Sequence, residues 1–150
     1  MANAKKLTNI IIKVLKDRGL SPTHAMISAK ALINAELVGA HSHGLSRLKM
    51  YCDRIDKKVI NPKPKIKIKK ISSSISYVDA NNSIGFVAAD IAIKSLIKNT
   101  KKTGIGMVGV KNSGHYGLSS YFVEQAVKKN LMVWCFTCLL YTSPSPRDDR

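Results

Sequence analysis

The chain has 150 residues, 45% of them hydrophobic, which is enough for one domain with a buried core. Its 25 lysines and arginines outnumber its 9 aspartates and glutamates, giving a formal net charge of +16. No apolar run approaches the roughly 20 residues of a membrane span, and no stretch has the pattern of a signal peptide, so we expect a cytoplasmic protein with no membrane partner.

The last thirteen residues do not continue the pattern that precedes them. Residues 138–150 read as the translation of a sequencing adapter joined in frame to a truncated gene, with a natural Pro/Ser-rich tail as the alternative. We therefore expect residues 1–137 to be the amino-terminal part of a longer protein. Only Cys52 and Cys135 remain in that part, too few for a disulfide framework or a zinc site, which fits a reducing cytosol.

The excess of lysine raises the alternative of a basic nucleic-acid-binding domain without enzymatic activity. The lysines are spread along the chain, and a genome rich in AT codons explains much of their number. Only Lys63 to Lys70 is concentrated, and it contains few aromatic residues for base stacking. We therefore expect no nucleic-acid partner.

Three helices are predicted at the amino-terminal end. Apolar residues recur three and four positions apart over 7–15, which is typical of one helical stripe. Ser21 and Pro22 are a typical N-cap and first residue of a second helix, which runs toward Gly39. A third helix is expected from about Ser46 to Ile55.

The second half alternates strands and helices, so the fold class is α/β: amino-terminal helices followed by mixed β/α elements of an incomplete sheet. The expected elements are an edge strand at 65–69 with solvated lysines, a strand at 75–79, a turn at 81–83, a helix from Gly85 to about Asn99, a buried strand at 105–110, a helix at 118–128 and a final buried strand at 131–136.

Residues 39–47 gather two histidines, a serine and an arginine at the end of the second helix. Histidine exchanges protons near neutral pH, and arginine binds a carboxylate through a planar fork of donors. Ser42, His43 and Arg47 are thus candidates for chemistry on a small anion. In the alternative interpretation, Gly39 and Gly44 separate two helices that the polar residues cap.

A second candidate, His115, falls in the loop that follows the strand expected at 105–110. Sites collect in such loops because the loop is exposed while the strand that carries it is rigid. A histidine held there is a reasonable general acid or base, although it could instead satisfy a backbone carbonyl. A metal held by His41, His43 and His115 is a competing interpretation, but no cysteine or carboxylate stands beside them and Arg47 would repel a cation, so we expect no metal.

Together the two stretches resemble a known family over essentially residues 1–137. Ser42-His43-Gly44 is followed by Arg47 and Tyr51, and an Asn-Ser-x-His-x-Gly loop occurs at 112–117. Both patterns, at this spacing, are similar to those of the malate/L-lactate dehydrogenase type 2 family, which includes ureidoglycolate and sulfolactate dehydrogenase-like oxidoreductases.

This resemblance implies hydride transfer between NAD or NADP and a small 2-hydroxy or 2-oxo acid, or a cyclic imino acid, by a full-length homodimer. It implies that Arg47 holds the substrate carboxylate, that Ser42 hydrogen-bonds the substrate, and that His115 or His43 is the proton donor or acceptor. We favour His115 in that role, with His43 orienting the substrate, but the sequence leaves the choice open. The family does not use the Gly-x-Gly-x-x-Gly turn of a standard Rossmann fold, and its cofactor site lies mostly beyond residue 137, so the truncated chain is expected to be inactive alone.

Overall fold

The computed structural model describes residues 4–137. The interpretation of residues 138–150 as an adapter concerns residues outside this range. Along the described chain the elements are α1 (Ala4–Asp17), α2 (Pro22–Leu37), the 3-10 turns η1 (His41–His43) and η2 (Leu45–Arg47), α3 (Leu48–Asp56), β1 (Lys67–Lys70), β2 (Ile75–Ser83), α4 (Gly85–Thr103), β3 (Met107–Ser113) and α5 (Ser119–Val127).

The three amino-terminal helices form as the sequence predicts. The side chain of Ser21 caps α2 by accepting the N–H of His24 at 3.2 Å, and Pro22 is the first helical residue. Helix α3 begins at Leu48 rather than Ser46, because the two single-turn helices η1 and η2 occupy the intervening chain. The polar stretch between α2 and α3 is therefore an ordered pair of turns.

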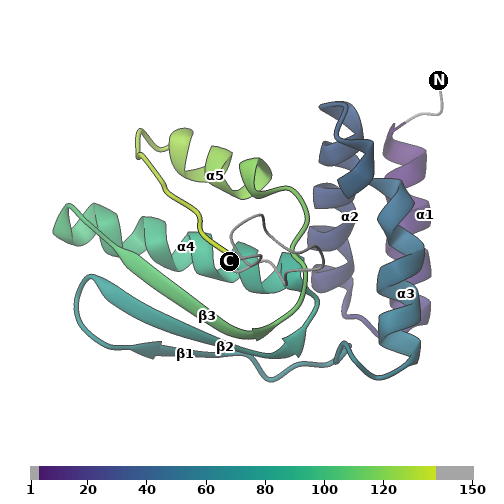
Figure 1. Ribbon diagram of the computed structural model, residues 1–150, viewed down its shortest axis with the longest axis horizontal. Coiled ribbons are helices and arrows are strands. Elements are labelled where there is room, and N and C mark those ends of the chain that lie inside the picture. The colour runs from purple at the N-terminus through teal and green to yellow at the C-terminus, as the bar shows by residue number, and fades with distance from the viewer. Residues whose placement is uncertain (1–3, 138–150) are drawn as a thin grey trace, which may run out of the picture.

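The sheet is small and mixed, with its strands in the order β1-β2-β3. β1 is antiparallel to β2, whereas β3 returns parallel to β2 after a crossover through α4. Helix α4 lies between the sheet and α5, and α2 packs against it from the helical half (Figure 1). This arrangement confirms the predicted α/β class and is not a doubly wound Rossmann sheet.

Asparagine side chains change the predicted boundaries of the first two strands. The strand expected at 65–69 begins only at Lys67, and the turn expected at 81–83 is an irregularity inside β2. Asn81 adopts a left-handed conformation (φ 50°), which asparagine tolerates better than most residues. Its side-chain oxygen accepts the N–H of Lys65 at 3.0 Å, so a side chain replaces the next rung of the strand pair.

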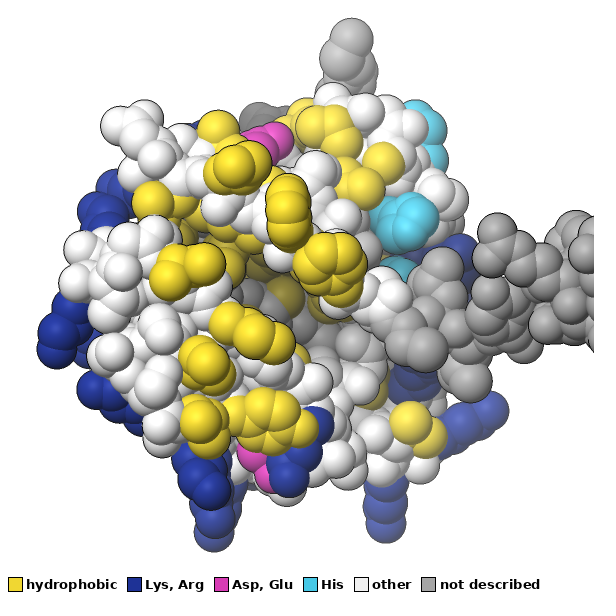
Figure 2. Space-filling model, turned by 60° about the vertical axis from the view of Figure 1, so that its left-hand side comes forward, with side chains coloured by type: hydrophobic (Ala, Val, Ile, Leu, Met, Phe, Trp, Pro, Cys, Tyr) yellow, Lys and Arg dark blue, Asp and Glu magenta, His cyan; other side chains and the backbone are white. Residues whose placement is uncertain are grey.

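Two strands predicted to be buried are not. β3 is shifted from the expected 105–110 and forms an edge of the sheet, where Met107 is 64% exposed. Residues 131–136 form no strand, and Trp134 and Phe136 are 77% and 84% exposed. Figure 2 shows that hydrophobic side chains, in yellow, are exposed over much of one face of the molecule. An apolar run signals a preference for burial, but the described residues contain no further strand or helix to cover it.

The core joins the helical half to the sheet half. Leu15, Leu32, Tyr51 and Phe86 are completely buried. The rings of Tyr51 on α3 and Phe86 on α4 lie 4.9 Å apart between centroids, so the first turn of α4 is packed directly on α3. None of the described helices combines the length and the apolar character that a membrane crossing requires.

Candidate active site

The loop between β3 and α5 carries His115 and rests on the beginning of α4. A side chain at Gly85, the first residue of α4, would overlap the backbone oxygens of Gly114 and His115. Glycine is needed at this position because the helix and the loop approach each other so closely. The loop is thereby held against a buried helix, although one side of His115 stays open to solvent.

The ring of His115 is anchored through its Nδ1 atom. The hydroxyl of Tyr51 lies 2.6 Å from Nδ1, and the N–H of Gly117 points to the same atom at 3.3 Å. Because Tyr51 is completely buried, it fixes the ring from beneath. No residue of the described chain hydrogen-bonds Nε2, so this nitrogen is the one that a ligand could meet.

The surroundings of the His115 ring favour its neutral form. Partial burial lowers the pKa of His115, and the positive charges of His43, Arg47 and Arg54 lower it further. Burial also raises the pKa of Tyr51 far above that of an ordinary phenol, so its hydroxyl keeps its proton. A neutral histidine beside several cationic side chains suits proton exchange on a bound anion.

The other predicted residues meet at the same place. The ring of His43 stacks on that of His115 with centroids 5.7 Å apart. Ser42 Oγ lies 2.9 Å from His43 Nδ1, and Arg47 Nε donates to the backbone oxygen of Ser42 at 2.7 Å. The structure thus brings Ser42, His43, Arg47 and His115 into one cluster, although the two sequence stretches are far apart in the chain.

Two further residues belong to this cluster. The sequence indicated Tyr51 as part of the family pattern, but not as the partner of His115. Its position four residues after Arg47 places the two on one helical face, which is a signal that could have revealed it. The second residue is Glu36, which forms hydrogen bonds to His41 in η1 and to the backbone of Leu45 in η2. No sequence pattern indicated these bonds.

The histidines are not arranged as a metal site. No three histidine, cysteine, aspartate or glutamate side chains within residues 4–137 are grouped so that they could hold an ion. His41 is turned instead toward Glu36, with its Nδ1 2.5 Å from a carboxylate oxygen.

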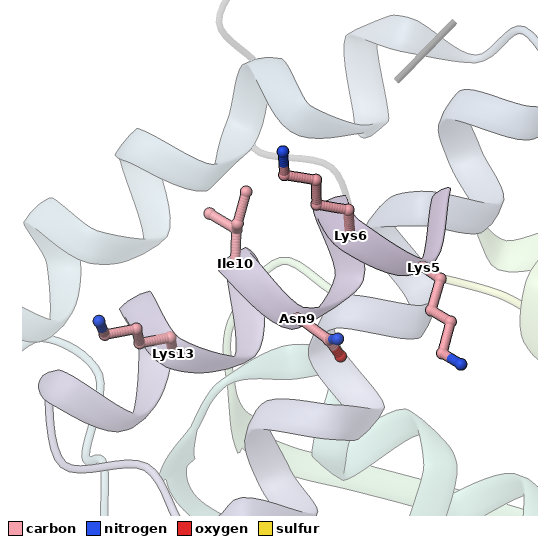
Figure 3. A pocket seen from close by; sticks show the side chains of 5 residues that line it. All are labelled: Lys5, Lys6, Asn9, Ile10 and Lys13. Carbon is pink, nitrogen blue, oxygen red and sulfur yellow. The ribbon is translucent and has the colours of Figure 1, made fainter. Parts of the chain in front are cut away.

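A hollow elsewhere on the surface is unrelated to the cluster. All the side chains that line it come from α1, and none is a residue of the site (Figure 3). They are Lys5, Lys6, Asn9, Ile10 and Lys13. A depression along one face of a single helix offers no convergent polar groups from other elements, so we assign it no role.

Comparisons with known proteins identify the family of this chain. The malate/L-lactate dehydrogenase family model matches residues 2–143. The malate/(S)-sulfolactate dehydrogenase of Methanothermus fervidus is 34% identical over 124 residues, covering 83% of this chain and 37% of that protein. The ureidoglycolate dehydrogenase (NAD(+)) of Escherichia coli K12 is 34% identical over 122 residues, covering 81% of this chain and 35% of that protein.

The fold is shared as well. The structure of sulfolactate dehydrogenase from Methanocaldococcus jannaschii superimposes with a TM-score of 0.83 at 34% identity, covering 85% of this chain and 37% of that one. The chain therefore spans little more than a third of the length of the relatives it matches. These relatives are all named as dehydrogenases, so the alternative of a nucleic-acid-binding domain has no support from them.

Proposed function

Since the chain belongs to the malate/L-lactate dehydrogenase family, we propose that it is part of an oxidoreductase that interconverts a small 2-hydroxy acid and its 2-oxo acid with NAD or NADP. The observation that carries this proposal is that His115 meets both Tyr51, 64 residues earlier in the chain, and His43, beside Arg47. An acid/base group next to an anion-binding group is what reduction of a 2-oxo acid needs from the protein.

His115 is the proposed acid and base, acting through Nε2. When the hydroxy acid is oxidised, the neutral ring carries its proton on Nδ1, so Nδ1–H donates to the oxygen of Tyr51 and the longer 3.3 Å contact from the Gly117 N–H is not a hydrogen bond in this state. Nε2 is then free to take the hydroxyl proton. In the reverse direction the doubly protonated ring returns the Nε2 proton to the developing alkoxide. The buried phenol stays neutral throughout, so it can hold the ring in either protonation state.

Arg47 is the proposed carboxylate-binding residue. Its Nε is already bound to the backbone of Ser42, which leaves the terminal nitrogens of the guanidinium for the substrate. Ser42 and His43 lie between Arg47 and His115 in this chain of contacts, so we propose that they orient the substrate. The carboxylate and the reacting oxygen are then held at fixed separation, as catalysis by positioning requires.

We propose that the described residues do not complete the dinucleotide site. A Gly-x-Gly-x-x-Gly pattern does occur at 104–109, but it joins the end of α4 to the beginning of β3, whereas the dinucleotide-binding turn joins a strand to the helix that follows it. The nicotinamide supplies hydride chemistry, and we propose that its binding residues lie in the length of the relatives that this chain does not span. We propose that the complete enzyme is a cytosolic homodimer and that residues 1–137 alone do not turn over substrate.

The test uses the intact gene product, including whatever native sequence follows Thr137. Nicotinamide absorbance is followed while the protein is offered a panel of 2-oxo acids and cyclic imino acids with each cofactor. We expect turnover that collapses in both His115→Ala and Arg47→Ala. Absence of turnover with every acid and both cofactors would overturn the proposal.

A further inference from the structure

Glu36, in the last turn of α2, holds both turns of the site with one carboxylate. One oxygen accepts the N–H of Leu45 at 2.6 Å, and the other lies 2.5 Å from Nδ1 of His41. These two partners flank Ser42, His43 and Gly44 in the sequence. The Glu36 side chain is 23% exposed, so it lies mostly beneath the turns rather than in solvent.

The glycine of the Ser-His-Gly pattern is explained by the same carboxylate. Gly44 is buried, and a side chain there would collide with the carboxylate of Glu36. The close approach of the Glu36 carboxylate thus accounts for a glycine at this position. Gly44 and Glu36 are therefore a matched pair.

Besides Glu36, the turns are held by the partly buried Leu45, which packs on the core, and by the stacking of His43 on His115. Each is a single turn of 3-10 helix without a side-chain cap, and neither contains a fully buried apolar side chain. Short 3-10 turns have poorer hydrogen-bond geometry than an α-helix and are not stable by themselves. The other side-chain hydrogen bonds of the turns, from Ser46 to His41, from Arg47 to Ser42 and between Ser42 and His43, connect one part of the turns to another and are exposed.

We propose that Glu36 is a positioning residue for substrate binding: it ties η1 and η2 to α2 so that Arg47 and His43 face His115. This inference rests on the proposed function. Hydrogen bonds from His41 and then from the Leu45 backbone lower the pKa of the Glu36 carboxyl, so it is ionised at neutral pH and acts as a strong acceptor.

The test compares substitutions in the intact gene product, assayed with the best 2-oxo acid. In Glu36→Ala we expect the KM for the acid to rise about tenfold or more, with a much smaller change in kcat, because Tyr51 and not Glu36 anchors His115. Glu36→Gln keeps an acceptor for Leu45 and offers an amide donor to His41, so it should recover most of the loss. Glu124→Ala, which removes an exposed carboxylate on α5, is the matched control.

Two double substitutions separate positioning from simple destabilisation. Because turnover collapses in Arg47→Ala, this pair is compared by the Kd of the 2-oxo acid, measured by calorimetry with the nicotinamide cofactor present. The effect of Glu36→Ala on that Kd should vanish when Arg47 is already alanine, because Glu36 acts through Arg47. Gly44→Ala should raise KM by displacing the carboxylate, and it should add nothing to Glu36→Ala. Gly44→Ala disturbs the same contact by changing Gly44 instead of Glu36. It therefore still tests the inference if Glu36→Ala folds poorly.

The outcomes distinguish this inference from the function on which it rests. Turnover with an unchanged KM in Glu36→Ala, or effects of Glu36→Ala and Arg47→Ala that simply add, would overturn the positioning role alone. A lowered melting temperature without a KM change would also overturn it. No turnover by the unsubstituted protein would overturn the proposed function and this inference together.

Discussion

The hydroxyl of Tyr51 lies 2.6 Å from Nδ1 of His115, although 64 residues separate them in the chain. This contact joins the helical half of the protein to the loop that follows the sheet. It also determines which ring nitrogen is available to a substrate, because Nδ1 is engaged and Nε2 is not.

Replacing Tyr51 by phenylalanine tests that contact. We expect kcat/KM of the intact enzyme to fall roughly tenfold, equal to about 1.4 kcal/mol, the upper range of one net hydrogen bond. The stability should change little, because the ring of Tyr51 still packs on Phe86. Steady-state kinetics and thermal unfolding measure the two effects. Tyr77→Phe on the sheet is the control, and an equal loss in both variants would contradict the role of the Tyr51 hydroxyl.

The pH dependence of the two reaction directions should reflect the lowered pKa of His115. Reduction needs the protonated ring, so its kcat/KM should fall as pH rises through that pKa. Oxidation needs the neutral ring, so its kcat/KM should fall as pH drops through the same value. We expect both inflections below about 6.5, the ordinary pKa of histidine. Profiles measured from pH 5 to 8 test this, and an inflection above pH 7 would contradict it.

Gly117 and Gly114 offer a matched pair in the His115 loop. Gly117 has φ +77°, and a Cβ there would lie 2.5 Å from the Phe86 ring, whereas a Cβ on Gly114 meets nothing within 4 Å. Gly117→Ala should therefore lower the free energy of unfolding by about 1–2 kcal/mol, and Gly114→Ala by much less. Denaturant unfolding measures the difference. Equal effects would show that the loop does not rest on Phe86 as described.

The N-cap of α2 can be tested in the same way. Ser21→Ala removes the oxygen that accepts the His24 N–H, and we expect a loss of about 1 kcal/mol in the free energy of unfolding. Thr23→Ala changes an exposed residue of the same turn and should have little effect. A Ser21→Ala protein as stable as the parent would show that the cap contributes nothing.

Trp134 is the only tryptophan of the chain and serves as a reporter of the uncovered apolar side chains. Because it is 77% exposed, its fluorescence in the 150-residue chain should resemble that of free N-acetyl-tryptophanamide in both emission maximum and acrylamide quenching. The chain should also bind a hydrophobic dye, since Met107, Met132 and Phe136 are exposed as well. A blue-shifted, protected emission would contradict this description.

Local signals in the sequence were sufficient to predict the helices. The cap at Ser21 and Pro22 depends on residues that are adjacent, so α2 could be predicted closely. The sequence placed Ser42, His43, Arg47 and His115 at the ends of two elements, and the structure brings these residues together, but their roles stay a prediction. The strand expected at 131–136 was wrong because periodicity reports a preference for burial and not the presence of a pairing partner.

The contacts of Glu36 and the conformation of Asn81 could not be predicted from local sequence patterns, for a different physical reason. Both act through side-chain hydrogen bonds to backbone N–H groups that lie far along the chain, at Leu45 and Lys65. A glutamate near a helix end and an asparagine near a strand end are common, and their partners are determined only when the surrounding elements have packed.

The parallel pairing of β2 with β3 also constrains the order in which the parts of the candidate site form during folding. Parallel neighbours must be joined by a crossover, here α4, and closing such a connection costs chain entropy before any contact is gained. His115 is presented only when that closure is complete, whereas Arg47 belongs to a helical segment with mostly local contacts. We therefore expect the helical segment that carries Arg47 to form early in folding. The loop that carries His115 should take its final position last, together with the whole fold.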